Sequence, residues 1–286
     1  MIRRILVPFD GSPSSRSALS IACNISGIIG AELVGLYVED ESRFVDVSLA
    51  AAIAENVTAN PIINHPLPPE QMLEVEEEVA GERAVLRQLF RELCADDEVE
   101  AEFLSARGAP AEVIAEKARA ADYIIMGSSG LHRGRDHAPD GATVEALLRA
   151  TTRPVLVLPD EPVGQARAVI AYDGSRASER ALAAGAEICS ICEIRDVHVL
   201  SVGFSAEETK RIQAPALEYL AAYGLTPVAA SASGKAGDAI GRYADEVDTS
   251  VLVLGAFGSN RLSEMLFGST THDVLRYGGA ATLLVG

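Results

Sequence analysis

The tripeptide Asp-Gly-Ser occurs twice in the chain, starting at Asp10 and again at Asp173, 163 positions later. Each copy follows a short apolar segment that opens with arginine, residues 4–9 and 167–172. The same offset aligns the helical-looking segments that come after the two tripeptides. A buried strand, a tight turn and a helix repeated at one offset indicate that the chain contains two copies of one fold.

Both copies alternate apolar runs with segments of helical periodicity. Strands are predicted at 2–8, 32–38, 99–105, 123–126, 154–158, 167–172, 197–202, 226–232, 251–254 and 281–285. Helices are predicted at 14–29, 70–95, 110–120 and 141–150, then after Ser175, at 206–223 with a kink or restart at Pro215, at 237–244 and from about 272. Such alternation favours an α/β fold class: two tandem domains, each a five-stranded parallel sheet with helices on both faces, as in Rossmann-like folds.

The domains are expected to cover residues 1–160 and 166–286. The first is longer because of a proline-rich insertion at about 39–69, with a weak helix at 48–54, and a longer following helix. The inward stripe of that helix is expected to be Met72, Val75, Val79, Leu86, Leu89 and Leu93. The glutamates near its start are expected to form a solvated face: Glu70, Glu74, Glu76, Glu77 and Glu78.

The charge balance limits the partners. The net charge is −17 and the pI about 4.7, so the surface repels nucleic acid and anionic membranes. No apolar run approaches the roughly 20 residues of a membrane span. The N-terminal apolar run breaks at Pro8, too early for the core of a signal peptide. We therefore expect a cytoplasmic protein with neither nucleic acid nor membrane as a partner.

The chain has four cysteines, two of which form a C-x-x-C pair at Cys189 and Cys192. A redox function needs a setting that lowers a thiol pKa, whereas this pair ends a helical segment, so structural thiols are favoured. A loop in the first half contains His132, Asp136, His137 and Asp140. Their spacing does not support a metal site, and none is predicted.

Ligand sites in open parallel sheets lie at the carboxyl ends of the strands. In each half, the aspartate after the first strand and a glycine loop after the fourth should meet there. The aspartate suits ribose hydroxyls, and the loop amides suit phosphates. The alternative is that Asp10 and Asp173 only fix the turn before their helices. The Walker motif, G-x-G-x-x-G after the first strand and the G-x-S-x-G elbow are absent, which argues against P-loop NTPases, dinucleotide dehydrogenases and α/β hydrolases.

The loop after the fourth strand of the second half reads Gly255-x2-Gly258-x9-Gly268-Ser269. With the repeated Asp-Gly-Ser and the closing segment RPVLVLP at 153–159, this resembles the universal stress protein family in its tandem two-domain form. Nucleotide-binding members of that family carry G-x2-G-x9-G-[ST] at this place. The resemblance implies an adenine nucleotide alpha hydrolase-like fold, with adenosine and then phosphates near Ala171, Asp173, Val202, Gly255, Gly258, Gly268, Ser269 and Thr270.

The first half departs from this pattern. Its corresponding residues are Pro8, Asp10, Val38, Gly127, Gly130, Gly141 and Thr143. Ten residues rather than nine separate Gly130 from Gly141, and Ala142 replaces the hydroxyl residue. Nucleotide binding is therefore expected chiefly in the second half. The alternative is that the glycines only shape a turn and Ser269 caps the last helix.

The resemblance implies a stress-response protein that binds ATP, ADP or AMP in a signalling or protective role. No side chain in the loop is an evident catalytic base, so any ATP hydrolysis is expected to be slow. The alternative is a nucleotide-free interaction module that acts through domain pairing and dimerisation. This alternative is supported by the final strands, 155–158 and 282–285, which are apolar and need a partner if they lie at sheet edges. The expected partner is a second copy or the other domain.

Overall fold

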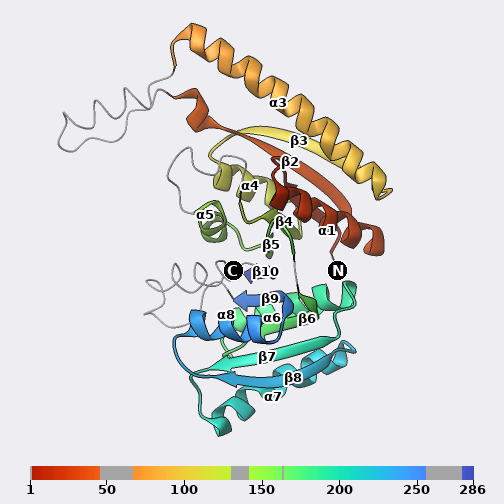
Figure 1. Ribbon diagram of the computed structural model, residues 1–286, viewed down its shortest axis with the longest axis vertical. Coiled ribbons are helices and arrows are strands. Elements are labelled where there is room, and N and C mark those ends of the chain that lie inside the picture. Colours follow the sequence, from red (N-terminus) through yellow and green to blue (C-terminus); the bar gives the residue numbers. More distant parts are fainter. Residues whose placement is uncertain (1, 46–66, 130–141, 163, 256–278) are drawn as a thin grey trace, which may run out of the picture.

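The protein is described from a computed structural model of residues 1–286 (Figure 1), in which residues 2–45, 67–129, 142–162, 164–255 and 279–286 are placed. The first half contains β1 (Arg4–Pro8), α1 (Pro13–Ile29), β2 (Glu32–Asp40), η1 (Glu41–Phe44), α3 (Pro69–Asp96), β3 (Ala101–Gly108), α4 (Pro110–Ala118), β4 (Tyr123–Gly127), α5 (Ala142–Ala150) and β5 (Val155–Leu158). The second contains β6 (Gln165–Ala171), α6 (Arg176–Ile191), β7 (Asp196–Val202), α7 (Ala206–Ala222), β8 (Thr226–Ala232), α8 (Ala236–Glu246), β9 (Thr249–Gly255) and β10 (Ala281–Val285). The weak helix expected at 48–54 and the helix expected from about 272 lie outside the placed residues.

The ten strands form one sheet in the order β3-β2-β1-β4-β5-β10-β9-β6-β7-β8. Each half contributes five parallel strands, which confirms the predicted α/β class. The halves join where β5 and β10 pair antiparallel, with Leu156 opposite Leu283. The final strands are therefore partners of each other, and β3 and β8 are the outer edges (Figure 1).

Two layers of helices cover the sheet. Side chains from α1, α3, α6 and α7 pack on one face, and side chains from α4, α5 and α8 pack on the other. This arrangement buries both faces of the central strands, which explains why their middle residues are apolar, whereas the outer strands β3 and β8 are partly exposed. Within the placed residues, no helix has the length and apolar character required to cross a membrane.

The start of α1 follows from its sequence. Ser12 is the N-cap and accepts a hydrogen bond from the Ser15 amide at 3.2 Å, and Pro13 is the first helical residue, as predicted. Helix α7 runs unbroken from Ala206 to Ala222 although it contains Pro215, so of the two predicted alternatives the restart is wrong and the kink stays a prediction. Pro215 and Arg211, whose carbonyl loses its helical donor, are both exposed, and water can satisfy that carbonyl.

Helix α3 packs through the predicted stripe, but its most buried residue is another one. Val79 and Leu86 are buried as expected, and Phe90, which is fully buried, lies between Phe9 and Phe103 with ring centroids 5.5 and 5.2 Å away. A Cβ atom on Gly35 of β2 would lie 2.5 Å from the nearest atom of the Phe90 ring. The missing side chain at Gly35 therefore makes room for Phe90.

Candidate functional site

Three of the predicted nucleotide-site residues of the second half end adjacent strands. Ala171 is the last residue of β6, Val202 of β7 and Gly255 of β9. Strand β6 lies between β9 and β7, and all three are parallel, so these residues lie together where the strands have their carboxyl ends, which we call the carboxyl edge of the sheet. The other predicted phosphate-loop residues lie outside the placed residues: Gly258, Gly268, Ser269 and Thr270.

Ala171 and Val202 form part of an apolar surface at this edge. Both are partly buried and pack against the core beneath α8, as does Ala232 at the end of β8. Val38 of the first half occupies the matching place, near the carboxyl end of β2. Pro8 ends β1 and is partly buried. A partly exposed apolar surface of this kind suits an aromatic ring or a base.

The two aspartates form the same turn. An Asp10 Oδ1 accepts the Ser12 amide at 3.0 Å, and Asp173 Oδ1 accepts the Ser175 amide at 2.9 Å. The glycine between each pair has positive φ, 78° at Gly11 and 76° at the second copy. The turn-fixing alternative is thus realised in both halves, while contact of Asp173 with a ribose stays a prediction.

The charge of Asp173 is stabilised locally. Partial desolvation alone would raise the pKa of this carboxyl, but hydrogen bonds from Ser175 and Ser178 outweigh it and the net pKa is lowered. Its side chain is exposed at the sheet edge, in front of the N-terminus of α6. A carboxylate that stays charged and accessible can accept hydrogen bonds from ligand hydroxyls.

The first glycine of each loop has a packing function. A Cβ atom on Gly127 would lie 2.7 Å from the Ser14 carbonyl carbon, and one on Gly255 would lie 2.6 Å from the Ala177 carbonyl carbon. These distances are too short for any side chain. Both glycines therefore allow the end of the fourth strand to approach the helix that follows the first strand.

The loop of the first half begins with hydrogen bonds that the sequence does not predict. The backbone carbonyl of Ser129 accepts hydrogen bonds from the hydroxyls of Ser14 at 2.6 Å and Ser12 at 3.1 Å. The side-chain hydroxyl of Ser129 donates to Asp160 Oδ1 at 3.1 Å. At the Ser14 position, the second half has Ala177. The cluster of serines at both places in the sequence was the available signal. Gly130 and Gly141 lie outside the placed residues, and Thr143 is exposed in the first turn of α5.

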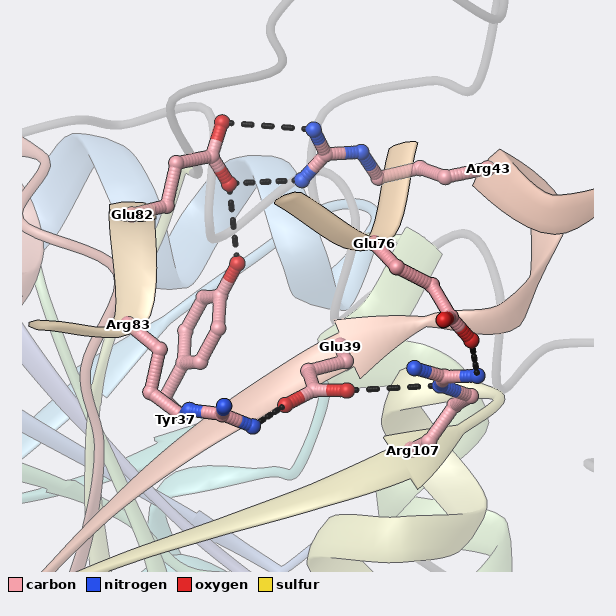
Figure 2. A network of polar contacts seen from close by, with 7 residues as sticks. All are labelled: Tyr37, Glu39, Arg43, Glu76, Glu82, Arg83 and Arg107. Atoms are coloured by element: carbon pink, nitrogen blue, oxygen red, sulfur yellow. Dashed lines mark hydrogen bonds and ion pairs between the residues drawn. The ribbon is translucent and has the colours of Figure 1, made fainter. Parts of the chain in front are cut away.

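A network of charged side chains holds α3 to the strand ends of the first half (Figure 2). Glu39 accepts hydrogen bonds from Arg83 at 2.7 Å and Arg107 at 3.3 Å, and only 6% of its side chain is exposed. Arg107 also pairs with Glu76 at 3.5 Å and lies 3.9 Å from the centre of the Phe44 ring. Burial of Glu39 is compensated because two guanidinium groups neutralise it.

A second part of this network uses Glu82 of α3. It accepts hydrogen bonds from Arg43 at 2.6 Å and from the Tyr37 hydroxyl at 2.9 Å (Figure 2). Burial and the bond to Glu82 raise the pKa of Tyr37. We call the whole set the strand-end network: Tyr37, Glu39, Arg43, Glu76, Glu82, Arg83 and Arg107. The expected solvated face is thus only partly correct, since Glu76 and Glu78 are exposed yet form ion pairs.

The C-x-x-C pair has the properties of structural thiols. Burial raises the pKa of Cys189 to about 12 and also raises that of Cys192. A raised pKa disfavours the reactive thiolate. Among the placed residues, no three His, Cys, Asp or Glu side chains gather as metal ligands do. The loop with His132, Asp136, His137 and Asp140 lies outside them.

Comparisons with known proteins agree with this architecture. The sequence profile of the universal stress protein family matches residues 1–159 and again 166–285. The curated universal stress protein Slr1230 of Synechocystis sp. is 29% identical over 157 residues, which is 54% of this chain and 54% of that protein. This chain therefore matches about half the length of that relative.

The fold is also found in a solved structure. A universal stress protein from Archaeoglobus fulgidus matches with a TM-score of 0.73 at 20% identity, over 99% of this chain and 95% of that one. Together with the two profile matches, this accounts for both halves of the sheet. The chain belongs to the universal stress protein family, with two copies of the family fold in tandem.

Proposed function

We propose that the second half binds an adenine nucleotide, ATP or its products ADP and AMP, at the carboxyl edge of β6, β7 and β9. The observation that carries this proposal is the meeting of Ala171, Val202 and Gly255 at the ends of three adjacent strands. The sequence after Gly255 then continues with the G-x2-G-x9-G-S spacing of nucleotide-binding family members.

Each part of the nucleotide has a chemical counterpart at this edge. The base would lie on the apolar surface of Ala171 and Val202, and the ribose hydroxyls would donate to the Asp173 carboxylate. The phosphates would bind amides and hydroxyls of the loop, at Gly258, Gly268, Ser269 and Thr270. Because the net charge is −17, these local donors must outweigh an unfavourable overall field.

The first half has the same apolar surface and turn, at Pro8, Val38 and Asp10, but its loop differs in length and lacks the hydroxyl residue at Ala142. We therefore expect the second half to be the main site. The loop sequence from Gly255 to Thr271 contains no lysine or histidine that could act as a catalytic base. We therefore propose a signalling or protective stress function in the cytoplasm, with slow ATP hydrolysis at most.

Two measurements test nucleotide binding. Protein purified without added nucleotide is denatured, and the supernatant is analysed for adenine nucleotides; fresh protein is then titrated with ATP by calorimetry. We expect released nucleotide or a binding heat, and the absence of both would exclude the proposal. Gly268→Asp should abolish binding, because a carboxylate would crowd and repel the phosphates. The matched variant Gly141→Asp in the first half should leave the second-half site intact.

The alternative, a nucleotide-free interaction module, retains one supporting observation: the halves pair through β5 and β10. That pairing occupies both final strands within one chain. A homodimer would therefore have to use other surfaces, and light scattering on the purified protein would detect it. Domains at 1–160 and 166–286 are likewise a proposal, which limited proteolysis tests by cleavage near residues 160–165.

A further inference from the structure

Two cysteines of the first half face each other where α1 and α3 pack. The Sγ atoms of Cys23 and Cys94 lie 3.9 Å apart, although the residues are 71 positions apart in the sequence. They are 1% and 3% exposed, within the core on this face of the sheet. In the second half, Ala186 takes the position of Cys23 at the repeat offset, so this thiol pair belongs to the first half alone.

The geometry favours formation of a bond between these sulfurs. A disulfide has an S–S distance of about 2.05 Å, so an approach of about 2 Å closes it. Cys94 lies in the last turn of α3, which ends at Asp96 and is followed by Glu98 with a positive φ of 56°. The last turn of a helix opens more easily than its middle, and here the Cys94 and Ala95 carbonyls accept amides from just beyond the helix, those of Val99 and Glu98. Local opening there gives both the approach and access for a small oxidant.

We propose that Cys23 and Cys94 are a redox modification site, which a hydroperoxide converts into an intramolecular disulfide between α1 and α3. This site is distinct from the proposed nucleotide site and does not depend on it. The strand-end network already holds the first half of α3, through Glu76, Glu82 and Arg83, and the disulfide fixes its C-terminal turn. Oxidation would thus add a covalent link to the apolar packing that already holds the C-terminal half of α3.

The chemistry balances with hydrogen peroxide as the oxidant. The Cys94 thiol loses its proton and its sulfur attacks one peroxide oxygen; the O–O bond breaks, and the departing hydroxide takes up that proton as water. Cys23 sulfur then attacks the resulting sulfenic acid, the S–O bond breaks, and the hydroxyl leaves with the Cys23 proton as a second water. Two thiols are oxidised to one disulfide, and one peroxide is reduced to two waters.

The order of attack follows from the contact between the thiols. Cys23 donates its hydrogen bond to the Cys94 sulfur, which lowers the pKa of Cys94, and the same bond together with burial raises the pKa of Cys23. Cys94 is also the residue nearer to a helix end. It is therefore the thiol that reacts first with peroxide.

Peptide mapping of the full-length protein tests the proposal. The reduced, folded protein is treated with hydrogen peroxide, free thiols are alkylated, and the chain is digested with trypsin. The cysteines fall in three separate peptides, 17–43, 92–107 and 181–195, the last of which contains both residues of the C-x-x-C pair. We expect 17–43 joined to 92–107, and separation of the two by dithiothreitol.

Variants and stability provide the controls. The double variant Cys189→Ser, Cys192→Ser should keep the cross-link, whereas Cys94→Ser should lose it. The oxidised wild type should melt several degrees above the reduced form, because the cross-link restricts the unfolded chain, and Cys94→Ser should show no such rise. Alkylation of both Cys23 and Cys94 after oxidation, or linkage to 181–195 or to a second chain instead, would overturn the proposal. The wild-type mapping decides this even if a variant fails to fold.

Discussion

The carboxyl ends of the strands are built differently in the two halves. In the first half, Glu39 at the end of β2 binds two arginines, one of them Arg107 near the end of β3. In the second half, the strand pairing places Gly203 and Ser233 at the matching positions. The ends of β2 and β3 thus carry charged side chains that pair with α3, whereas the matching positions after β7 and β8 carry small uncharged residues. The two halves share the same strands and helices, but the residues at the carboxyl ends of their strands differ.

The features that the halves share are those that the packing requires. Both have an aspartate turn, a serine N-cap on the following helix and a glycine at the end of the fourth strand. None of these needs a ligand to explain it. The features that differ, namely the strand-end network and the two loops, are therefore the ones expected to make ligand binding unequal in the two halves.

The largest expected effect comes from the shared glycines. Gly127→Ala and Gly255→Ala each place a Cβ atom within 2.7 Å of a helix backbone, and backbone cannot move aside as a side chain can. We expect each variant to lower the free energy of unfolding by about 3 kcal/mol, at the upper end for overpacked sites. Urea denaturation followed by circular dichroism measures it.

Gly27→Ala in α1 is the matched control, because a Cβ atom there meets nothing within 4 Å. It should be neutral or stabilising, since alanine is the better helix former. A similar loss in the control, or a loss in only one of the two strand-end variants, would show that the halves do not share this packing function.

Much of this frame could be predicted from the sequence. Apolar runs and helical periodicity located the strands and helices within a few residues, because each half repeats the same pattern and both sheet faces are buried. Ser12 as N-cap and Pro13 as the first helical residue are local signals that predicted the start of α1. The apolar part of the site, Ala171 and Val202, followed from the rule that ligands bind at strand ends.

The strand-end network could not be predicted in this way. Its arginines and glutamates come from β2, β3, α3 and η1, and nothing in local spacing tells which of many surface charges will meet. Glu39 continues a strand whose pattern gives no sign of a buried carboxylate. Phe90 was missed for a related reason: its burial depends on the absence of a side chain at Gly35, far away in the sequence.

An intermediate loss of stability is expected when the charge of Glu39 is removed from the strand-end network. Glu39→Gln removes the charge that neutralises Arg83 and Arg107 but keeps the size of the side chain. We expect a loss of about 1.5–3 kcal/mol, the range for hydrogen bonds to charged groups. Hydrogen exchange should speed up in the first half of α3, while the second half of the chain is unchanged.

The second half provides a control ion pair that is more exposed. Asp196 pairs with Arg167 at 2.6 Å, with side-chain exposures of 38% and 25%. Asp196→Asn should cost less than Glu39→Gln, because solvent screens exposed pairs. Equal losses in the two variants would mean that burial of Glu39 adds nothing to the network.

The smallest expected loss of stability comes from removing the aspartate of each turn. Asp173→Ala removes the acceptor of the Ser175 amide, and Asp10→Ala removes that of the Ser12 amide, so each should cost less than about 1.5 kcal/mol at pH 7. For Asp173 the loss should also depend on pH. Its pKa in the folded protein is below the ordinary value of 3.8, so its contribution is present above that value and disappears as the pH falls through the lowered pKa. Urea denaturation at pH 7, 5, 3 and 2 should therefore give a difference in the free energy of unfolding between wild type and Asp173→Ala that is constant at pH 7 and 5 and smaller at pH 3 and 2. A difference that grows on acidification would contradict a turn stabilised by the charged carboxylate, and would leave a ligand as the main reason for an aspartate at this place.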